Sequence, residues 1–293
     1  MHKLIISLTT ISSRLQHVHR VIEFLLVQDF PRHAYEVRLY LSKEPYLLDE
    51  GCPKLTPELE QLLKKNKGRL DVAYVKNVGP YRKIIPVLNE VYAYSSTEFC
   101  NTLIVTADDD TAYPSSWLRR LYDSYLVHRC VIGFRGRSMK YDANRLIAYK
   151  KWPKNIDANP SLFNVPTGKD GVLYCPLHLN PEVLDIATAQ QLAPKADDLW
   201  LKTHTLLAAA PSYIINSTLD QEFPSVTGSE PVVSLYRSFN QRGGNDEALD
   251  SLDRHLKGKF DLDFYRLCCA PENAFQLHAR AIDLLLSDNR YAT

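Results

Sequence analysis

The 293-residue sequence lacks a charge excess and any long apolar run. Lys and Arg number 35 against 34 Asp and Glu, so the broad electrostatic attraction to nucleic acids or to strongly anionic membranes is not expected. No apolar run approaches the ~20 residues of a membrane span, and the apolar core of the N-terminus is too short for a signal peptide. The sequence therefore predicts a soluble, cytoplasmic protein that binds no nucleic acid.

The sequence also lacks a cysteine spacing that would indicate a disulfide or a metal site. The six cysteines are scattered, show no C-x-x-C spacing, and include the adjacent pair Cys268 and Cys269, which is not expected to bridge to itself. This pattern is typical of reduced thiols and not of a disulfide framework or a zinc site. No internal repeat or low-complexity segment is found, and the length suits one large α/β domain or two small ones.

Strand-like and helix-like patterns alternate through about residue 130. Apolar, β-branched runs predict strands at residues 3–8, 37–41, 70–75 and 103–106, with helical patterns between them. This alternation predicts right-handed crossovers and a mainly parallel sheet. Further along, residues 131–171 are rich in Pro, Gly and Asn with short β-like pieces. Helical character returns from Pro181, one more strand is predicted at residues 211–215, and polar helices follow from Glu247.

Three consecutive aspartates, Asp108, Asp109 and Asp110, follow the strand pattern of residues 103–106. Ligand sites of parallel sheets lie outside the carboxyl ends of the strands. Mg²⁺ and Mn²⁺ prefer carboxylate oxygens and commonly combine one or two carboxylates with substrate phosphates. The alternative is a solvated turn in which Asp110 caps a helix expected near Pro114. Capping explains one aspartate, whereas three adjacent like charges need a counter-ion, so the motif favours a metal site for a phosphate-bearing substrate.

A second acidic pair, Asp197 and Asp198, comes just before the helical apolar pattern that starts at Leu199. One interpretation is a helix cap together with an acid that the helix dipole favours. The other is a general base that accepts a proton from an incoming hydroxyl. The spacing alone favours neither interpretation.

Two basic pairs, Arg82 with Lys83 and Arg135 with Arg137, each follow a predicted strand or turn. Such pairs are able to bind a diphosphate, although paired surface basics are more often only solvated. The loop at residues 167–176 has two glycines that permit unusual backbone angles or close approach to a ligand, or it is a plain surface loop. Residues 240–246, NQRGGND, have the composition of a capped turn.

Six blocks in order resemble bacterial glycosyltransferases of the GT-A fold, near family 2, that build capsule and lipopolysaccharide glycans. They are ISLTTISSRL at 5–14, YRKIIP at 81–86, LIVTADDDTAYPSSWLRRLY at 103–122, GVLYCP at 171–176, DDLWLK at 197–202 and GGNDEAL at 243–249. The resemblance implies a GT-A α/β fold with a mainly parallel, Rossmann-like sheet. It implies a nucleotide-sugar-binding half at residues 1–130, an acceptor-side half at 131–246 and a helical C-terminal extension at 247–293.

The resemblance also implies roles for individual residues. Thr9, Thr10 and Arg14 correspond to the loop that holds the nucleotide. Asp108 and Asp110 correspond to an Asp-x-Asp motif that binds Mn²⁺ or Mg²⁺ on the donor diphosphate, and a downstream acid acts as base. The residues expected at the donor and the base are, in full, Thr9, Thr10, Arg14, Arg82, Lys83, Asp108, Asp109, Asp197 and Asp198. In this chain the loop before LYCP reads GKDG, which is poorer in glycine than in the sequences it resembles.

The function so implied is metal-dependent transfer of a sugar, by default from a UDP-hexose, to a glycan or lipid-linked glycan, with inversion. Peripheral association with the inner face of a membrane is compatible with this role. A retaining enzyme stays open, as do a haloacid dehalogenase-type phosphatase and a non-catalytic binding module. Against the phosphatase, Ala112 stands where that class has a hydroxyl residue. The tryptophans are either core residues or able to stack on sugar rings; Trp117 and Trp200 are predicted to be core residues, and Trp152 is the better candidate to stack on the acceptor.

Overall fold

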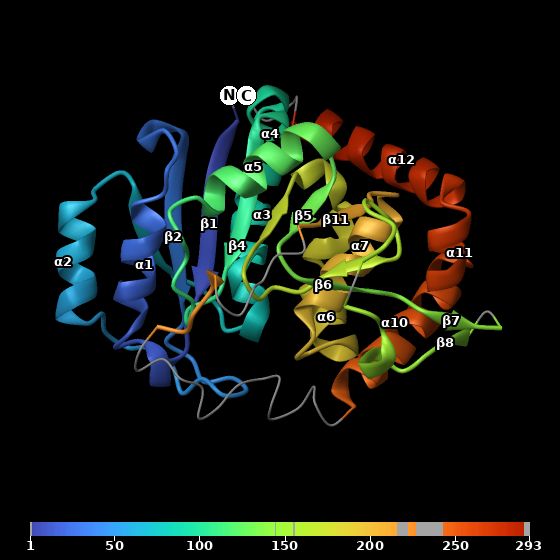
Figure 1. The fold of residues 1–293 in the computed structure, drawn as a ribbon, viewed down its shortest axis with the longest axis horizontal. Coiled ribbons are helices and arrows are strands. Elements are labelled where there is room, and N and C mark those ends of the chain that lie inside the picture. The colour runs from blue at the N-terminus through green and yellow to red at the C-terminus, as the bar shows by residue number, and fades with distance from the viewer. Residues whose placement is uncertain (1, 144, 155, 216–221, 227–242, 290–293) are drawn as a thin grey trace.

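The computed structural model describes residues 2–143, 145–154, 156–215, 222–226 and 243–289. Its centre is a seven-stranded sheet with the strand order β11-β5-β10-β4-β1-β2-β3 (Figure 1). The strands of this sheet are β1 (Lys3–Thr9), β2 (Tyr35–Leu41), β3 (Leu70–Tyr74), β4 (Thr102–Ala107), β5 (Val131–Gly133), β10 (Val172–Tyr174) and β11 (Ser212–Ile214).

Every strand pair in this sheet is parallel except those made by β10, which runs antiparallel to both β4 and β5. The predicted mainly parallel α/β sheet is therefore confirmed, including the strand expected at residues 211–215. The sheet joins both halves of the chain, because β10 pairs with β4 and continues the sheet through β5 to β11. Because β1 and β4 are adjacent and parallel, their carboxyl ends lie at the same edge of the sheet. The loops that follow these two strands therefore meet at that edge, where ligands of such sheets bind.

Helices cover both faces of the sheet (Figure 1). They are α1 (Val18–Leu26), α2 (Pro57–Lys65), α3 (Ile85–Tyr92), α4 (Ser96–Cys100), α5 (Trp117–His128), α6 (Ile186–Leu192), α7 (Asp197–Leu207), α10 (Gly244–Phe260), α11 (Phe264–Cys269) and α12 (Glu272–Asn289). Local signals explain several boundaries. In α2, for example, Thr56 is the N-cap and accepts a hydrogen bond from the Leu59 N–H, and Pro57 occupies the first turn. No helix in the described part of the chain is long and apolar enough to cross a membrane.

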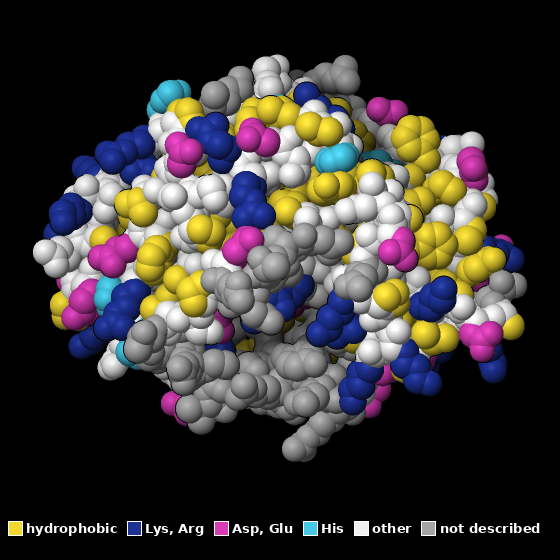
Figure 2. Space-filling model, viewed as in Figure 1, with side chains coloured by type: hydrophobic (Ala, Val, Ile, Leu, Met, Phe, Trp, Pro, Cys, Tyr) yellow, Lys and Arg dark blue, Asp and Glu magenta, His cyan; other side chains and the backbone are white. Residues whose placement is uncertain are grey.

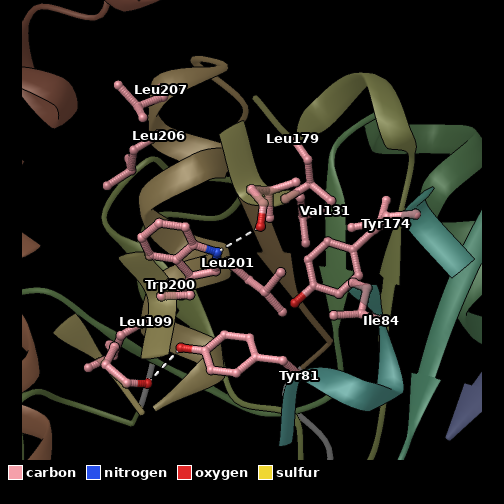
Figure 3. Packing of buried hydrophobic residues seen from close by; sticks show 14 of the residues in the cluster. Tyr81, Ile84, Val131, Tyr174, Leu179, Leu199, Trp200, Leu201, Leu206 and Leu207 are labelled. Atoms are coloured by element: carbon pink, nitrogen blue, oxygen red, sulfur yellow. Dashed lines mark hydrogen bonds between the residues drawn. The ribbon is translucent and has the colours of Figure 1, made fainter. Parts of the chain in front are cut away.

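Two hydrophobic clusters pack on the two faces of the sheet because alternate residues of a strand point to opposite sides. Leu103 and Val105 of β4 face the cluster that includes α1 and α5, whereas Ile104 faces the cluster that includes α3, α7 and α10. Figure 3 shows Trp200 of α7 within the second cluster, where its Nε1–H donates to the carbonyl of Val183 at 3.0 Å. The central strands are thus buried on both sides, which is why they read as continuous apolar runs.

Four short strands lie between β5 and β10, within the region of residues 131–171 where the sequence predicted short β-like pieces. β6 (Gly136–Ser138) pairs antiparallel with β9 (Asn164–Pro166), and β7 (Tyr141–Asp142) pairs antiparallel with β8 (Arg145–Leu146). Gly243, in the left-handed backbone region, precedes α10, while residues 240–242 of the predicted capped turn lie outside the described residues.

Candidate active site

The aspartate motif begins immediately after β4, at the carboxyl edge of the sheet. The Asp108 N–H donates to the Tyr113 hydroxyl at 2.7 Å, and the Asp110 carbonyl accepts from the Val226 N–H at 2.9 Å. Asp110 does not cap a helix, because α5 starts later, with Ser116 as its N-cap and no side-chain cap bond. The capping alternative for Asp110 is therefore wrong.

Asp109 points toward the loop that follows β1. Its carboxylate accepts a hydrogen bond from the Thr10 hydroxyl, and its Oδ1 lies 2.6 Å from the Arg14 guanidinium. Arg14 also lies 3.3 Å from Asp110. Burial opposes the charge of Arg14, but Asp109 and Asp110 outweigh it and raise the pKa of the guanidinium. The nucleotide-loop candidates Thr10 and Arg14 are thus brought directly to the aspartate motif.

Arg82 is buried beneath the Thr10 loop, whereas Thr9 is partly exposed and its hydroxyl is bonded to the neighbouring strand. The Thr9 hydroxyl donates to the Tyr40 carbonyl of β2 at 2.8 Å. Arg82 is 1% exposed, pairs with Asp49 at 2.8 Å, and donates to the Thr10 carbonyl at 3.0 Å. The buried Arg82–Asp49 pair therefore holds the Thr10 loop in place from below.

Lys83 connects the two acidic segments of the chain. It ends a short 3-10 helix, η3 (Gly79–Lys83), and its Nζ lies 2.9 Å from Asp197 Oδ2 and 3.7 Å from Asp108 Oδ1. Burial alone would lower the pKa of this ammonium, but Asp197, Asp108 and Asp198 raise it well above the usual lysine range. Lys83 is therefore a permanent cation among the carboxylates.

Asp197 and Asp198 occupy the first turn of α7 without capping it. The N-cap is Ala196, and no side chain makes a cap bond there. Asp197 is buried against Lys83, whereas Asp198 stays partly exposed and accepts a hydrogen bond from the Gly168 N–H at 3.0 Å. Burial and then the charge of Asp197 raise the pKa of Asp198 to about 7, against the opposing effect of Lys83. A carboxylate with a pKa near neutrality suits proton transfer.

The loop at residues 167–171 passes so close to its neighbours that a side chain at either of two glycines would displace them. A Cβ on Gly168 would lie 2.7 Å from Lys83 Nζ and 3.0 Å from Asp198 Oδ1. Gly171 has a φ of +98°, and a Cβ there would lie 2.6 Å from the Trp117 ring. The same loop carries Asp170, which is fully buried and forms a 2.7 Å ion pair with Arg135.

Five carboxylates meet in this region, namely Asp108, Asp109, Asp110, Asp197 and Asp198. Lys83 and Arg14 form ion pairs with them, so negative charge is in excess among the described residues. Burial, then the charges of Asp108 and Asp109, raise the pKa of Asp110 to about 6. The pKa of Asp108 is raised by burial and by Asp109, against the effect of Lys83. Burial is the largest cause of these raised pKa values, and the charges of the neighbouring carboxylates add to it.

A divalent cation fits this chemistry. Within the described part of the chain, no group of three or more His, Cys, Asp or Glu side chains is arranged to hold a metal alone. Two carboxylates are, however, the number that Mg²⁺ commonly takes from a protein when a substrate diphosphate supplies further oxygens. Asp108 and Asp110 would hold such an ion, because Asp109 has the closest partners, the Thr10 hydroxyl and Arg14 at 2.6 Å, whereas Arg14 is 3.3 Å from Asp110 and Lys83 is 3.7 Å from Asp108.

The three tryptophans are all buried. Trp117 and Trp200 are core residues, as predicted. The prediction for Trp152 is wrong, because it is only 2% exposed and its Nε1–H donates to the Ile147 carbonyl at 2.8 Å. The aromatic ring that is partly exposed there is Tyr149, which stacks under Arg137 at 5.1 Å.

Asp49 and Asp170 are supporting residues that the sequence did not indicate. Each is a buried carboxylate that pairs with an arginine far away in the sequence, Arg82 and Arg135 respectively. The one local signal is an adjacent or nearby glycine with positive φ, at Gly51 and Gly171. That signal marks a tight turn and does not reveal which charge the turn will meet.

The fold is similar to that of solved glycosyltransferases. A mannosyltransferase from Pyrobaculum calidifontis, in complex with GDP-Man and Mn²⁺, matches with a TM-score of 0.53 and 11% identity over 98% of this chain and 75% of that chain. S. aureus TarS 1-349 in complex with UDP-GlcNAc matches with a TM-score of 0.48 and 13% identity over 99% and 92%. No family model and no curated protein matches the sequence. The likeness to the mannosyltransferase confirms the predicted GT-A type of α/β fold.

Proposed function

We propose that this protein is a metal-dependent glycosyltransferase that moves a sugar from a nucleotide-sugar to a hydroxyl of a glycan acceptor. The observation that carries the proposal is the meeting of the two acidic segments, Asp108–Asp110 and Asp197–Asp198, around Lys83. One segment follows a central strand and the other begins a helix in the opposite half of the chain. A glycosyltransferase binds two substrates, and we assign the first acidic segment to the donor and the second to the acceptor.

The donor side comprises the aspartate motif and the loop after β1. Asp108 and Asp110 would hold Mn²⁺ or Mg²⁺, which supplies positive charge to the diphosphate as it departs. Arg14 and Thr10 fix Asp109 and so set the motif against the nucleotide loop. Lys83 lies 3.7 Å from Asp108, near enough to add a further positive charge on the donor side. Arg82 supports this side from beneath, and Thr9, partly exposed at the end of β1, belongs to the proposed nucleotide loop.

On the acceptor side, Asp198 is the proposed general base. It is partly exposed, its pKa is raised to about 7, and the Gly168 N–H fixes one of its oxygens. Asp198 takes the proton of the acceptor hydroxyl while the acceptor oxygen bonds to the anomeric carbon. The bond from that carbon to the diphosphate oxygen breaks, and the configuration inverts. Asp197 keeps Lys83 in place and is a positioning residue.

The wider assignment is also a proposal. We assign the donor as a UDP-hexose and the pathway as surface polysaccharide or lipopolysaccharide synthesis, in the cytoplasm or at the inner face of its membrane. The divisions at residues 1–130, 131–246 and 247–293 correspond to donor, acceptor and C-terminal helical parts. The mannosyltransferase with a similar fold was solved with GDP-Man, so GDP-sugars belong in the test beside UDP-sugars.

The test is a release assay with nucleotide-sugars and Mn²⁺. Water serves as the default acceptor, the released nucleoside diphosphate is quantified, and proton NMR records the first-formed anomer of the free sugar. Release of one nucleotide class with an inverted anomer supports the proposal, and a retained anomer would remove the base role of Asp198. Release from none of the UDP-, GDP-, dTDP- or CMP-sugars would contradict glycosyl transfer.

A further inference from the structure

Basic residues are concentrated in one short segment of a chain that is otherwise balanced. Residues 135–154, here called the basic segment, contain seven Lys or Arg and a single acid, Asp142, whereas the whole chain has a formal net charge of +1. The rest of the chain is therefore net acidic. A local charge of this size creates a field that attracts anions to one part of the surface.

Five of these basic side chains are exposed, namely Lys140, Arg145, Lys150, Lys151 and Lys154. In the ranges that the structure describes, none of the five forms an ion pair. The other two are engaged, because Arg135 pairs with Asp170 and Arg137 donates to the Trp152 carbonyl at 3.0 Å. Figure 2 shows Lys and Arg side chains gathered in the lower right of the molecule, where Figure 1 places β7, β8 and α10.

The basic segment folds as one unit. The Ser138 N–H donates to the Pro153 carbonyl at 3.0 Å, and the Ile147 N–H donates to the Lys140 carbonyl at 3.0 Å. At its end, the Tyr149 N–H donates to Asp246 at the start of α10 at 2.7 Å. These bonds bring the early and late basic residues to one surface. Their charges therefore act together on a ligand.

One end of the basic segment reaches the candidate active site. Its first residue, Arg135, pairs with Asp170 and accepts a hydrogen bond at its carbonyl from the Thr167 N–H at 3.0 Å. The next residue of that loop, Gly168, donates to Asp198. The surface thus extends outward from the proposed general base, where an acceptor chain would approach.

We infer that the basic segment binds the acceptor, and that the acceptor is an anionic glycan whose repeating units carry phosphate or carboxylate groups. This inference rests on the proposed glycosyl transfer. The exposed lysines and Arg145 would meet charges along the acceptor chain.

An anionic membrane surface would also attract lysines, but the composition of this surface disfavours it. The large apolar side chains that are exposed in the described residues are Phe24, Val27, Tyr74, Leu126, Val127, Phe275 and Leu284, and none belongs to the basic segment. Membrane-surface segments usually combine basic residues with apolar side chains that enter the bilayer. The basic segment offers charge without that apolar component.

The test compares binding to dextrans that share one backbone and length: neutral dextran, carboxymethyl-dextran and phosphorylated dextran. The variant is Lys150→Gln, Lys151→Gln, Lys154→Gln. The matched control is Lys64→Gln, Lys65→Gln, Lys67→Gln, which removes three exposed lysines at α2, on the far side of the molecule (Figure 1). Phosphatidylglycerol vesicles and single-stranded DNA are titrated in parallel, and nucleotide binding with Mn²⁺ is measured on every variant.

The expected result is that wild type binds one or both charged dextrans and not the neutral one, with affinity that falls as salt is raised. The basic-segment variant should bind them about tenfold more weakly, and the control within about twofold of wild type. The relative affinities for the two charged dextrans identify carboxylate or phosphate. Equal losses in both variants, no binding to either charged dextran, or tighter binding to vesicles or DNA would overturn the inference. Absent nucleotide binding in wild type would instead contradict the proposed function.

Discussion

The Nζ atom of Lys83 lies 2.9 Å from Oδ2 of Asp197, and this ion pair distinguishes the two adjacent acids at the start of α7. Asp197 is buried and neutralised by the lysine, whereas Asp198 is partly exposed and has its pKa raised to about 7. Because Lys83 also lies 3.7 Å from Asp108, one ammonium group connects the proposed metal-binding motif with the acidic pair that contains the proposed base. The predictions below follow from this relationship.

Asp198→Asn is expected to lower turnover by about 10²–10⁴-fold, because the amide cannot accept the proton of the acceptor hydroxyl. Nucleotide binding should be retained, since Asp198 lies on the acceptor side. Asp197→Asn should cost less turnover, because Asp197 acts through Lys83. Steady-state kinetics and nucleotide titrations on both variants check this. A larger loss of turnover from Asp197→Asn would assign the base to the other carboxylate.

Lys83→Met is expected to shift the acid limb of the pH–rate profile to higher pH. The ionised form of Asp198 is the active base, so the rate of wild type should fall as pH drops below about 7. The Lys83 charge lowers the pKa of Asp198, so its removal raises that pKa and requires a higher pH for the same rate. Lys67→Met, at an exposed site, is the control. An unchanged limb would show that Lys83 does not tune the base.

Gly168→Ala is expected to reduce turnover strongly, because the new methyl group would lie 2.7 Å from Lys83 Nζ and 3.0 Å from Asp198 Oδ1. Gly258→Ala is a matched control, since a Cβ at that position within α10 meets nothing within 4 Å. The control should keep full activity and gain roughly 0.5–1 kcal/mol of stability from the helix propensity of alanine. Activity of Gly168→Ala equal to that of the control would contradict the described geometry.

Asp198→Asn should raise the melting temperature more at pH 8 than at pH 5. Burial and Asp197 raise the pKa of Asp198 from 3.8 to about 7, so the folded protein binds this proton more tightly than the unfolded chain. The folded state is therefore destabilised as pH rises from 3.8, the pKa of Asp198 in the unfolded chain, to about 7, its pKa in the folded protein. Asparagine does not ionise, so the variant does not lose this stability. Each kcal/mol recovered corresponds to about 2–4 °C in a large single domain. An equal shift at both pH values would contradict a raised pKa.

The sequence predicted the elements that depend on local pattern. The strand at residues 103–106 was recognised from its β-branched residues, and the aspartates after it fall at the carboxyl edge of the sheet as expected. The antiparallel strand β10 was not predicted, because three residues are too few for a periodic signal. Trp152 was misplaced because its burial depends on how residues 137–154 fold back on themselves.

Ion pairs between residues that are far apart in the sequence could not be predicted from the sequence. Arg82 was expected at a diphosphate, yet it is paired with Asp49, 33 positions away, beneath the Thr10 loop. Nothing near either residue signals this pairing, since a charged residue in a loop is usually solvated. Similarly, spacing alone could not show that neither acid at the start of α7 caps the helix. The contacts that these carboxylates make instead involve Lys83 and Gly168, which come from two distant parts of the chain.

The most direct test of the central claim is calorimetric titration of UDP, GDP, dTDP and CMP, each with and without Mn²⁺. Wild type, Asp110→Ala and the control Asp123→Ala, at an exposed position of α5, are compared at pH 7.5. The account predicts that one nucleotide binds in a Mn²⁺-dependent manner to wild type and to the control, and that this binding is lost in Asp110→Ala. Failure of every nucleotide to bind wild type, with or without the metal, would contradict a nucleotide-sugar site and favour the phosphatase alternative.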